Sequence, residues 1–416
     1  MNVYIKSKNY LGINGLGRIG KLNVWNHMAL RHFDGVVINV GRQVGKSLDD
    51  IVQVLETDST YGNLNQFLFG QAGVHKTFEV IDEANGLITF GDFYIKILRK
   101  NRNPREVDWR NEGVRIVIDC TGVFVDPTAP ADDPKGSLRG HLEGGAHKVL
   151  LSAPFKIKDA ALKMPDDTKM VVYGINHIEF DPSKHHLISA ASCTTTGLSH
   201  MILPLLETRE TSQILTASMS TVHAATNSQS VLDAVPKASA SDLRKTRSVL
   251  NNIILSTTGA AKAMEKILPQ ISEIGFMADS VRIPTNTVSL IILNLTFDSG
   301  MNEKGEPVIN KSFINQIYQK FAEGPLKDLL YYSTRQNVSA DLIGKRAAVV
   351  IEGYETHTRT GFIQLSQDTL YSLGVSAEAH LNIPVTHAKI FGWYDNEFGS
   401  YVNSLGKLTV FIDKNL

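Results

Sequence analysis

The chain has 416 residues, of which 43% are hydrophobic, and its 42 lysines and arginines balance its 42 aspartates and glutamates. Because a single hydrophobic core usually stops growing before this length, we expect two domains. The balanced charge carries no signature of nucleic acid or of a membrane surface as a partner. Small anions can still bind through local clusters.

Cysteine usage bears on the compartment. Only Cys120 and Cys193 occur, whereas a secreted protein of this length that relied on disulfides would carry more. The first residues lack a basic segment followed by a long apolar one, and no stretch reaches the roughly 18 apolar residues of a membrane span. We therefore expect a cytoplasmic protein without a membrane segment.

The first third of the chain alternates short apolar runs with helical segments. Residues 10–14 predict a strand, which a glycine-rich turn joins to a helix over 18–30, and further buried strands are expected at 36–40, 116–118 and 149–151. This alternation is typical of an α/β domain with a Rossmann-type parallel sheet.

From about residue 213 the pattern changes to longer apolar runs. Strands are predicted at 214–222, 288–297 and 347–352, with a helix over 311–321. Such runs favour an α+β domain with a mixed, largely antiparallel sheet. Asp126 to Lys135, rich in proline and aspartate, is expected to be an exposed insertion, and 356–381 is a second candidate.

Asn14 to Gly20 reads Asn-Gly-Leu-Gly-Arg-Ile-Gly, which places Gly15, Gly17 and Gly20 between a strand and a helix. Glycines at this spacing permit a tight turn and let the backbone approach a pyrophosphate, while the helix N-terminus offers unpaired N–H groups to the anion. The motif predicts a dinucleotide site. A glycine-rich turn without a ligand is the alternative.

The end of the second strand bears on the cofactor. An NAD site normally carries an acidic residue there for the ribose hydroxyls, but this chain has Val40, followed by Arg42. Valine removes the repulsion against a 2'-phosphate, and arginine can pair with that phosphate. We therefore expect NADP to be favoured or both cofactors to be accepted. In the alternative, Arg42 is a solvated loop charge and NAD binds.

Cys193 stands among small polar residues just before an apolar helical run over 198–206. A cysteine at a helix N-terminus has its thiolate favoured, which suits a nucleophile. His223, at the end of a predicted strand, is the candidate base, although the chain has 13 histidines and spacing alone does not select it. Cys120 is interpreted as a small buried hydrophobic residue.

These stretches together resemble the glyceraldehyde-3-phosphate dehydrogenase family over most of the chain. The matching motifs, in family order, are Asn14 to Gly20, Tyr173-Gly174-Ile175-Asn176-His177, Ala191-Ser192-Cys193-Thr194-Thr195, Thr221-Val222-His223-Ala224, Ser256-Thr257-Thr258-Gly259-Ala260-Ala261-Lys262, Arg282-Ile283-Pro284-Thr285 and Trp393-Tyr394-Asp395-Asn396-Glu397-Phe398-Gly399. The resemblance implies phosphorylating oxidation of glyceraldehyde 3-phosphate through a thioester on Cys193, with hydride transfer to NAD or NADP.

Carried over residue by residue, the resemblance makes Cys193 the nucleophile and His223 the general base. It assigns Thr226 and Arg282 to the substrate phosphate. Inorganic phosphate is assigned to Ser192, Thr194, Thr258 and Gly259. Cofactor contacts are expected from Asn14, Gly15, Gly17, Arg18, Ile19, Gly20, Arg42, Thr121, Gly122 and Asn396, the last at the nicotinamide carboxamide. No metal site is expected.

The resemblance also implies the domain layout and the assembly. The cofactor domain would span 1–192 and be completed by a C-terminal helix of about 395–416, with the catalytic domain at 193–394. Residues 236–254 resemble the loop that reaches a neighbouring subunit's cofactor, so a homotetramer is expected; a basic, solvated excursion is the alternative for that loop.

Several positions depart from the family pattern. Thr196 stands where asparagine usually follows Cys-Thr-Thr, Val40 replaces the ribose-binding aspartate, and Asn103 stands in a turn that is usually Arg-Asp-Pro. Ala225 stands where tyrosine is common, and Gly399-Ser400-Tyr401 is altered after the terminal motif.

Two functions compete with the leading one: an erythrose-4-phosphate dehydrogenase, which releases an acid after water attacks the thioester, and an inactive relative that acts as a cofactor-sensing or interaction protein.

Overall fold

The computed structural model describes residues 9–416 except 72, 74, 237, 239 and 377–380. The chain divides into two compact units. The first comprises the residues up to Thr196 together with Ile343–Arg346 and Glu397–Leu416, and the second comprises Gly197–Leu342 and Ala347–Asn396. Parts of the predicted loop 236–254 and of the candidate insertion 356–381 lie outside the described residues.

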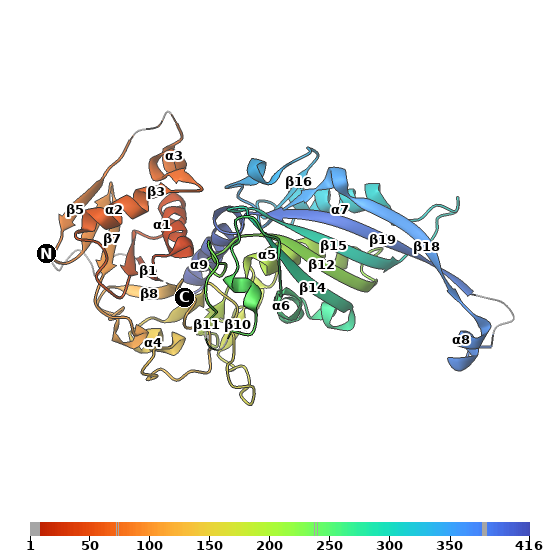
Figure 1. The fold of residues 1–416 in the computed structure, drawn as a ribbon, viewed down its shortest axis with the longest axis horizontal. Coiled ribbons are helices and arrows are strands. Elements are labelled where there is room, and N and C mark those ends of the chain that lie inside the picture. Colours follow the sequence, from red (N-terminus) through yellow and green to blue (C-terminus); the bar gives the residue numbers. More distant parts are fainter. Residues whose placement is uncertain (1–8, 72, 74, 237, 239, 377–380) are drawn as a thin grey trace. The chain divides into compact units, whose positions relative to one another are not determined.

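A nine-stranded sheet forms the centre of the first unit, in the order β10-β11-β9-β8-β1-β2-β7-β6-β5 (Figure 1). The strands are β1 (Tyr10–Asn14), β2 (Gly35–Asn39), β5 (Phe78–Asp82), β6 (Leu87–Phe90), β7 (Phe93–Leu98), β8 (Val114–Asp119), β9 (Lys148–Leu151), β10 (Thr168–Met170) and β11 (Leu187–Ser189). All pairs are parallel except β5 with β6 and β6 with β7. The Rossmann-type sheet is confirmed.

Five α-helices lie wholly within the described part of the first unit. They are α1 (Arg18–Leu30), α2 (Leu48–Glu56), α3 (Leu64–Phe69), α4 (Leu138–Glu143) and α9 (Asn403–Lys414); the short strands β3 (Thr57–Asp58) and β4 (Gly62–Asn63) form a separate hairpin. The C-terminal α9 packs on α1, and a Cβ at Gly406 would overlap the Asn26 amide nitrogen. A π-helical turn over Phe398–Val402 precedes α9.

The predicted insertion at 126–135 is less exposed than its composition indicates. Asp126 and Pro127 are buried, because the Asp126 carboxylate accepts bonds from the backbone of Thr128 at 2.9 Å and of Lys158 at 3.0 Å. A carboxylate satisfied by backbone N–H groups can be buried at small cost. The exposed residues of the segment are Pro130, Asp132, Pro134 and Lys135.

The second unit contains an eight-stranded sheet in the order β13-β14-β12-β15-β19-β17-β16, with β18 also paired to β19. Its strands are β12 (Ile214–Ala224), β13 (Ile254–Ser256), β14 (Gly275–Ile283), β15 (Ser289–Asp298), β16 (Leu330–Ser333), β17 (Val349–Glu352), β18 (His357–Leu365) and β19 (Leu381–Tyr394). Only β12 with β14 and β16 with β17 are parallel pairs, so the predicted mixed, largely antiparallel sheet is confirmed.

Helices α6 (Ala260–Ile267), α7 (Lys311–Glu323) and α8 (Gln367–Ser372) belong to this unit, while α5 (Cys193–Leu206) begins in the first unit and continues into the second. The candidate insertion at 356–381 is a long hairpin rather than a loop. It contains β18 and α8 and leads into β19, and α8 lies at its outer end (Figure 1).

Candidate active site and cofactor pocket

A cavity of about 740 Å³ opens in the first unit at the carboxyl ends of β1, β2 and β8. This is the edge at which parallel α/β sheets bind their ligands. It is lined by Asn14, Gly15, Gly17, Asn39, Val40, Gly41, Arg42, Arg102, Asn103, Glu106, Cys120, Thr121, Val123, Phe124, Pro134 and Lys135. The predicted residues Asn14, Gly15, Gly17, Arg42 and Thr121 therefore share one cavity.

The turn between β1 and α1 has the geometry that a dinucleotide phosphate needs. Gly15 has φ of 95°, which side chains rarely adopt, and a Cβ at Gly20 would overlap the carbonyl oxygen of Gly15. No side chain caps the N-terminus of α1, and its first turn has no acidic residue. The first N–H groups of the helix are thus available to an anion, so the turn fits the pyrophosphate of a dinucleotide.

A buried polar network fixes the floor of this pocket. The Asn14 side-chain amide donates to Asp119 at 2.8 Å and accepts from Asn39 at 2.8 Å. Trp109 Nε1 donates to Nδ1 of His141 at 3.0 Å, so Nε2 of His141 carries the proton and donates to Asp119 at 3.1 Å. The ends of β1, β2 and β8 are held together by these bonds.

Arg18 is oriented differently from the other predicted cofactor residues. Its guanidinium forms ion pairs with Asp58 and Glu397, both within the first unit. Burial opposes the charge on Asp58, but the bonds from Arg18 and Lys21 outweigh it and hold the pKa of that carboxyl well below its ordinary value. Arg18, Ile19, Gly20 and Gly122 do not line the cavity, and a role for them in cofactor binding remains a prediction.

Cys193 is the first residue of α5 and is half-buried against the core of the first unit. Ser192 caps the helix start: its Oγ accepts the backbone N–H of Thr195 at 3.2 Å and lies 2.8 Å from the Thr195 hydroxyl. The preceding Ala191 has φ of 56°, a left-handed conformation that costs a residue with a side chain about 1–2 kcal/mol.

Tyr401 supports this strained turn. Its hydroxyl donates to the carbonyl oxygen of Ala191 at 3.2 Å. Burial, and then the neighbouring thiols of Cys193 and Cys120, raises the pKa of Tyr401 well above its ordinary value, so the hydroxyl remains a donor. A cavity of only about 10 Å³ lies beside Tyr401 and Thr196.

Cys120 differs chemically from Cys193. Burial, with the adjacent Asp119 carboxylate, raises the pKa of the Cys120 thiol well above its ordinary value. A thiol is a weak nucleophile when it stays protonated. Its interpretation as a packing residue agrees with this, although it also lines the cofactor pocket.

In the second unit, the strand register sets His223 opposite Arg282, because β12 and β14 are parallel neighbours. Arg282 Nη1 contacts Nδ1 of His223 and donates to the carbonyl oxygen of Ala224 at 3.2 Å. Asn396 Nδ2 lies 3.2 Å from Nε2 of His223 and donates to Ser289 Oγ at 2.7 Å. His223, Arg282 and Asn396 are therefore brought together.

The environment of His223 keeps its ring neutral. Burial, and then the Arg282 guanidinium, lowers the pKa of His223 to about 4, and a bond to the Ala224 carbonyl only partly opposes them. Nδ1 of His223 lies 2.8 Å from the carbonyl oxygen of Ala224, which can only accept, and also contacts Arg282 Nη1, which can only donate. A neutral imidazole keeps one ring nitrogen that can take a proton.

The other predicted phosphate residues of this unit lie at two places. Thr226 follows the end of β12, with its hydroxyl 2.8 Å from that of Ser228. Thr258 and Gly259 lie between β13 and α6. Strand β13 begins with Ile254 opposite Arg282 and ends with Ser256 opposite Ser280, so the chain runs away from Arg282 before Thr258. Cys193, Ser192 and Thr194 belong to the first unit and His223 to the second, so their joint site remains a prediction.

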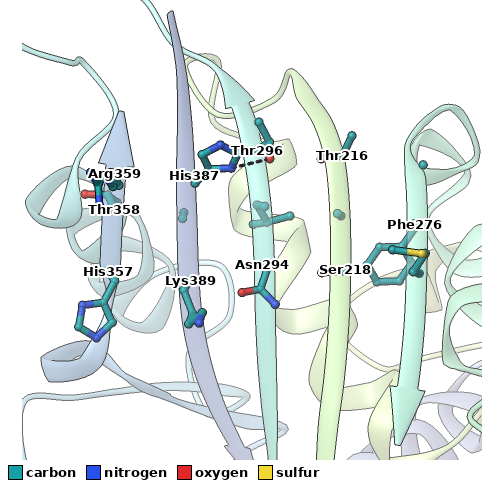
Figure 2. Close-up of a pocket in the computed structure, with 15 residues that line it drawn as sticks. Thr216, Ser218, Phe276, Asn294, Thr296, His357, Thr358, Arg359, His387 and Lys389 are labelled. Carbon is teal, nitrogen blue, oxygen red and sulfur yellow. Dashed lines mark hydrogen bonds between the residues drawn. The ribbon is translucent and has the colours of Figure 1, made fainter. Parts of the chain in front are cut away.

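A broad hollow of about 880 Å³ lies on one face of the second sheet, separate from these residues. Figure 2 shows that side chains of β12, β14, β15, β18 and β19 line it, among them Thr216, Phe276, Thr296, Arg359 and His387. A hydrogen bond of 2.9 Å joins Thr296 and His387 across neighbouring strands. None of the predicted catalytic or cofactor residues lines this hollow.

Comparison with known proteins decides the family. Residues 9–127 match the NAD binding domain of glyceraldehyde 3-phosphate dehydrogenase, and residues 192–396 match its C-terminal domain. Glyceraldehyde-3-phosphate dehydrogenase of Streptomyces coelicolor is 33% identical over 408 residues, covering 98% of this chain and 99% of that protein. The Geobacillus stearothermophilus enzyme of the same name is 32% identical and covers 94% of each chain.

This chain belongs to the glyceraldehyde-3-phosphate dehydrogenase family. The predicted resemblance and the assignment as a nicotinamide-dependent oxidoreductase are thereby confirmed. No helix among residues 9–416, apart from the few undescribed positions, combines the length and apolar character that crossing a membrane requires.

Sequence reasoning missed several residues that shape the dehydrogenase site. Asp119, His141 and Trp109 organise the pocket floor but lie far apart in the sequence, and no local motif links them. The departure from the family pattern at Gly399-Ser400-Tyr401 pointed to Tyr401. That pattern could not predict the hydrogen bond from Tyr401 to the carbonyl oxygen of Ala191. Ser289, which positions Asn396, carries no motif of its own.

We predict that Arg282→Gln raises the pKa of His223 from about 4 toward its ordinary value, because the repulsive guanidinium charge is removed. In the unmodified protein, protonation is disfavoured, so the ring should stay neutral from pH 7 down to about 4. The imidazole resonances can be titrated by NMR and assigned with a His223→Asn variant. Arg359→Gln, at an exposed arginine of the same unit, should leave this titration unchanged, and an unchanged pKa in Arg282→Gln would contradict the electrostatic explanation.

Proposed function

We propose that this protein is a phosphorylating glyceraldehyde-3-phosphate dehydrogenase that favours NADP over NAD and acts in the cytoplasm. The observation that carries the proposal is the pairing of His223 with Arg282. A neutral imidazole can take a proton, and a guanidinium beside it can bind the phosphate of the substrate. A phosphorylated aldehyde needs both groups at one place.

The reaction would begin with the sulfur of Cys193. His223 takes the proton of the Cys193 thiol and returns it to the aldehyde oxygen as the thiolate adds to the aldehyde carbon, which forms a hemithioacetal. His223 then takes the hydroxyl proton as hydride leaves the same carbon. The nicotinamide cofactor, when bound, supplies the hydride acceptor. A thioester remains on Cys193. An oxygen of inorganic phosphate then attacks its carbonyl carbon, the carbon–sulfur bond breaks, and 1,3-bisphosphoglycerate and the thiolate are released.

The supporting residues have distinct proposed roles. Thr226 and Arg282 would bind the phosphate of the aldehyde, and Ser192, Thr194, Thr258 and Gly259 would bind inorganic phosphate. Asn14, Gly15, Gly17 and Thr121 would hold the dinucleotide, with Asn396 at the carboxamide. The hydroxyl of Ser192 already accepts the Thr195 N–H at the start of α5, so Ser192 would bind phosphate while it caps the helix.

The cofactor preference rests on the pocket wall at the end of β2. Val40 and Arg42 both line the cavity, together with Arg102 from the loop after β7. An acidic side chain there would accept bonds from a free ribose, whereas arginine pairs with a 2'-phosphate. This wall therefore supports NADP as the favoured cofactor.

We also propose that the chain assembles as a homotetramer. The family resemblance supports this, and the open sheet face of Figure 2 offers a surface, on which Met277 is 73% exposed. Light scattering should give about four times the mass of the chain. Met277→Glu should yield smaller species, while Val54→Glu, on the exposed face of α2, should not; a monomeric unmodified protein would contradict the assembly.

Replacement of the nucleophile tests the chemistry directly. Cys193→Ser should abolish turnover and leave cofactor binding within about twofold, because a serine hydroxyl is not ionised at neutral pH. Alkylation should label one cysteine in the unmodified protein and none in the variant, since the Cys120 thiol has a raised pKa. Turnover by Cys193→Ser would refute the assignment.

Kinetics with the purified protein test the substrate and the cofactor together. Glyceraldehyde 3-phosphate should be oxidised faster than erythrose 4-phosphate, and its oxidation should require inorganic phosphate. The ratio kcat/KM should be about tenfold or more higher with NADP than with NAD, because one good phosphate–arginine contact contributes that much to binding. Phosphate-independent oxidation of erythrose 4-phosphate would favour the alternative dehydrogenase. No turnover with any combination would favour an inactive cofactor-binding relative.

A further inference from the structure

The segment Asp126 to Gly136 lies against the cofactor cavity of the first unit. Its last residues, Pro134 and Lys135, line the cavity together with Arg42 and Arg102. We propose that this segment is a cofactor-selectivity element and that Lys135 completes a three-cation site for a ribose 2'-phosphate. The inference rests on the proposed NADP preference and extends it to a residue outside the dinucleotide motif.

The segment is held in place at its beginning. The buried Asp126 carboxylate accepts bonds from the backbone and hydroxyl of Thr128, at 2.9 and 2.6 Å, and from the backbone of Lys158 at 3.0 Å. Burial opposes the charge, but these bonds outweigh it and lower the pKa of Asp126. Arg139, whose guanidinium pairs with Asp167, donates to the carbonyl oxygen of Pro127 at 3.0 Å.

The end of the segment is attached to the pocket wall. Asn103 donates from its side chain to the carbonyl oxygen of Asp133 at 3.3 Å, and a Cβ at Gly136 would lie 2.8 Å from the ring of Pro104. Asn103 and Pro104 directly follow Arg102, which also lines the cavity. Lys135 is therefore presented on the same wall as Arg102 rather than on a free loop.

The third cation comes from the loop after β2. A Cβ at Gly41 would lie 3.1 Å from the Cα of Arg102, so the two loops are in contact and Arg42 is beside Arg102. Within the described chain, the side chains of Arg42, Arg102 and Lys135 form no hydrogen bond or ion pair. Three uncompensated cations are available at one wall.

The local charge matches a dianion although the whole chain is neutral. Among the residues that line the cavity, three carry a positive charge and one, Glu106, a negative charge. The aspartates of the segment, at positions 126, 132 and 133, do not line it. A 2'-phosphate carries close to two negative charges at neutral pH, whereas the ribose 2'-hydroxyl of NAD would leave these cations without a partner.

The test uses the adenosine half of the cofactor alone, so that it does not depend on catalysis. Adenosine 2',5'-bisphosphate and 5'-AMP differ only in the 2'-phosphate, and calorimetric titration gives the dissociation constant of each. The unmodified protein should bind the bisphosphate at least tenfold more tightly. Lys135→Ala should weaken bisphosphate binding about fivefold and change 5'-AMP binding less than twofold, as expected for one exposed charge contact.

Matched variants separate the possible outcomes. Lys163→Ala removes an exposed lysine of the same unit away from the cavity and should bind both ligands like the unmodified protein, and Lys135→Arg should keep the selectivity. Equal binding of both ligands by the unmodified protein would overturn the NADP preference. Normal selectivity in Lys135→Ala, or equal weakening of both ligands, would overturn the role of Lys135 and leave the NADP preference standing.

Discussion

The Asp119 carboxylate organises the cofactor half of this dehydrogenase. It is fully buried, and its oxygens accept bonds from Asn14, His141 and both donors of Thr121. A buried charge is tolerated only when its bonding capacity is used, and loss of one partner from such a network costs about 1–3 kcal/mol. The same bonds fix the ends of three parallel strands, so the geometry of the glycine turn above them follows from the satisfaction of one carboxylate.

The second unit reaches its functional arrangement in another way. Backbone pairing of β12 with β14 places the imidazole of His223 next to the guanidinium of Arg282, and the end of β19 brings Asn396 to the same imidazole through Ser289. Because the side chains are set by the register of long strands, a one-residue slip would turn each of them to the opposite face. The length of these strands is therefore part of what positions the His223 imidazole.

The sequence predicted the elements whose pattern is local. The strand-turn-helix at 10–30, the longer strands of the second sheet and the helix beginning at Lys311 could be derived because apolar period and glycine spacing act over a few residues. The polar floor of the pocket could not, since Trp109, Asp119 and His141 meet only after β8 and α4 pack. The burial of Asp126 was missed for the same reason: proline and aspartate indicate solvent until backbone donors enclose the carboxylate.

Selectivity for a charged ligand in a chain without net charge requires local segregation of charge. In the first unit, several acidic side chains are engaged by structural bonds: Asp126 by backbone donors, Asp58 and Glu397 by Arg18, and Asp119 by the pocket floor. Arg42, Arg102 and Lys135 are left facing the cavity with Glu106 as the one opposing charge among its lining residues. These acidic side chains do not line the cavity, so cations outnumber acidic groups among its lining residues even though the composition of the chain is balanced.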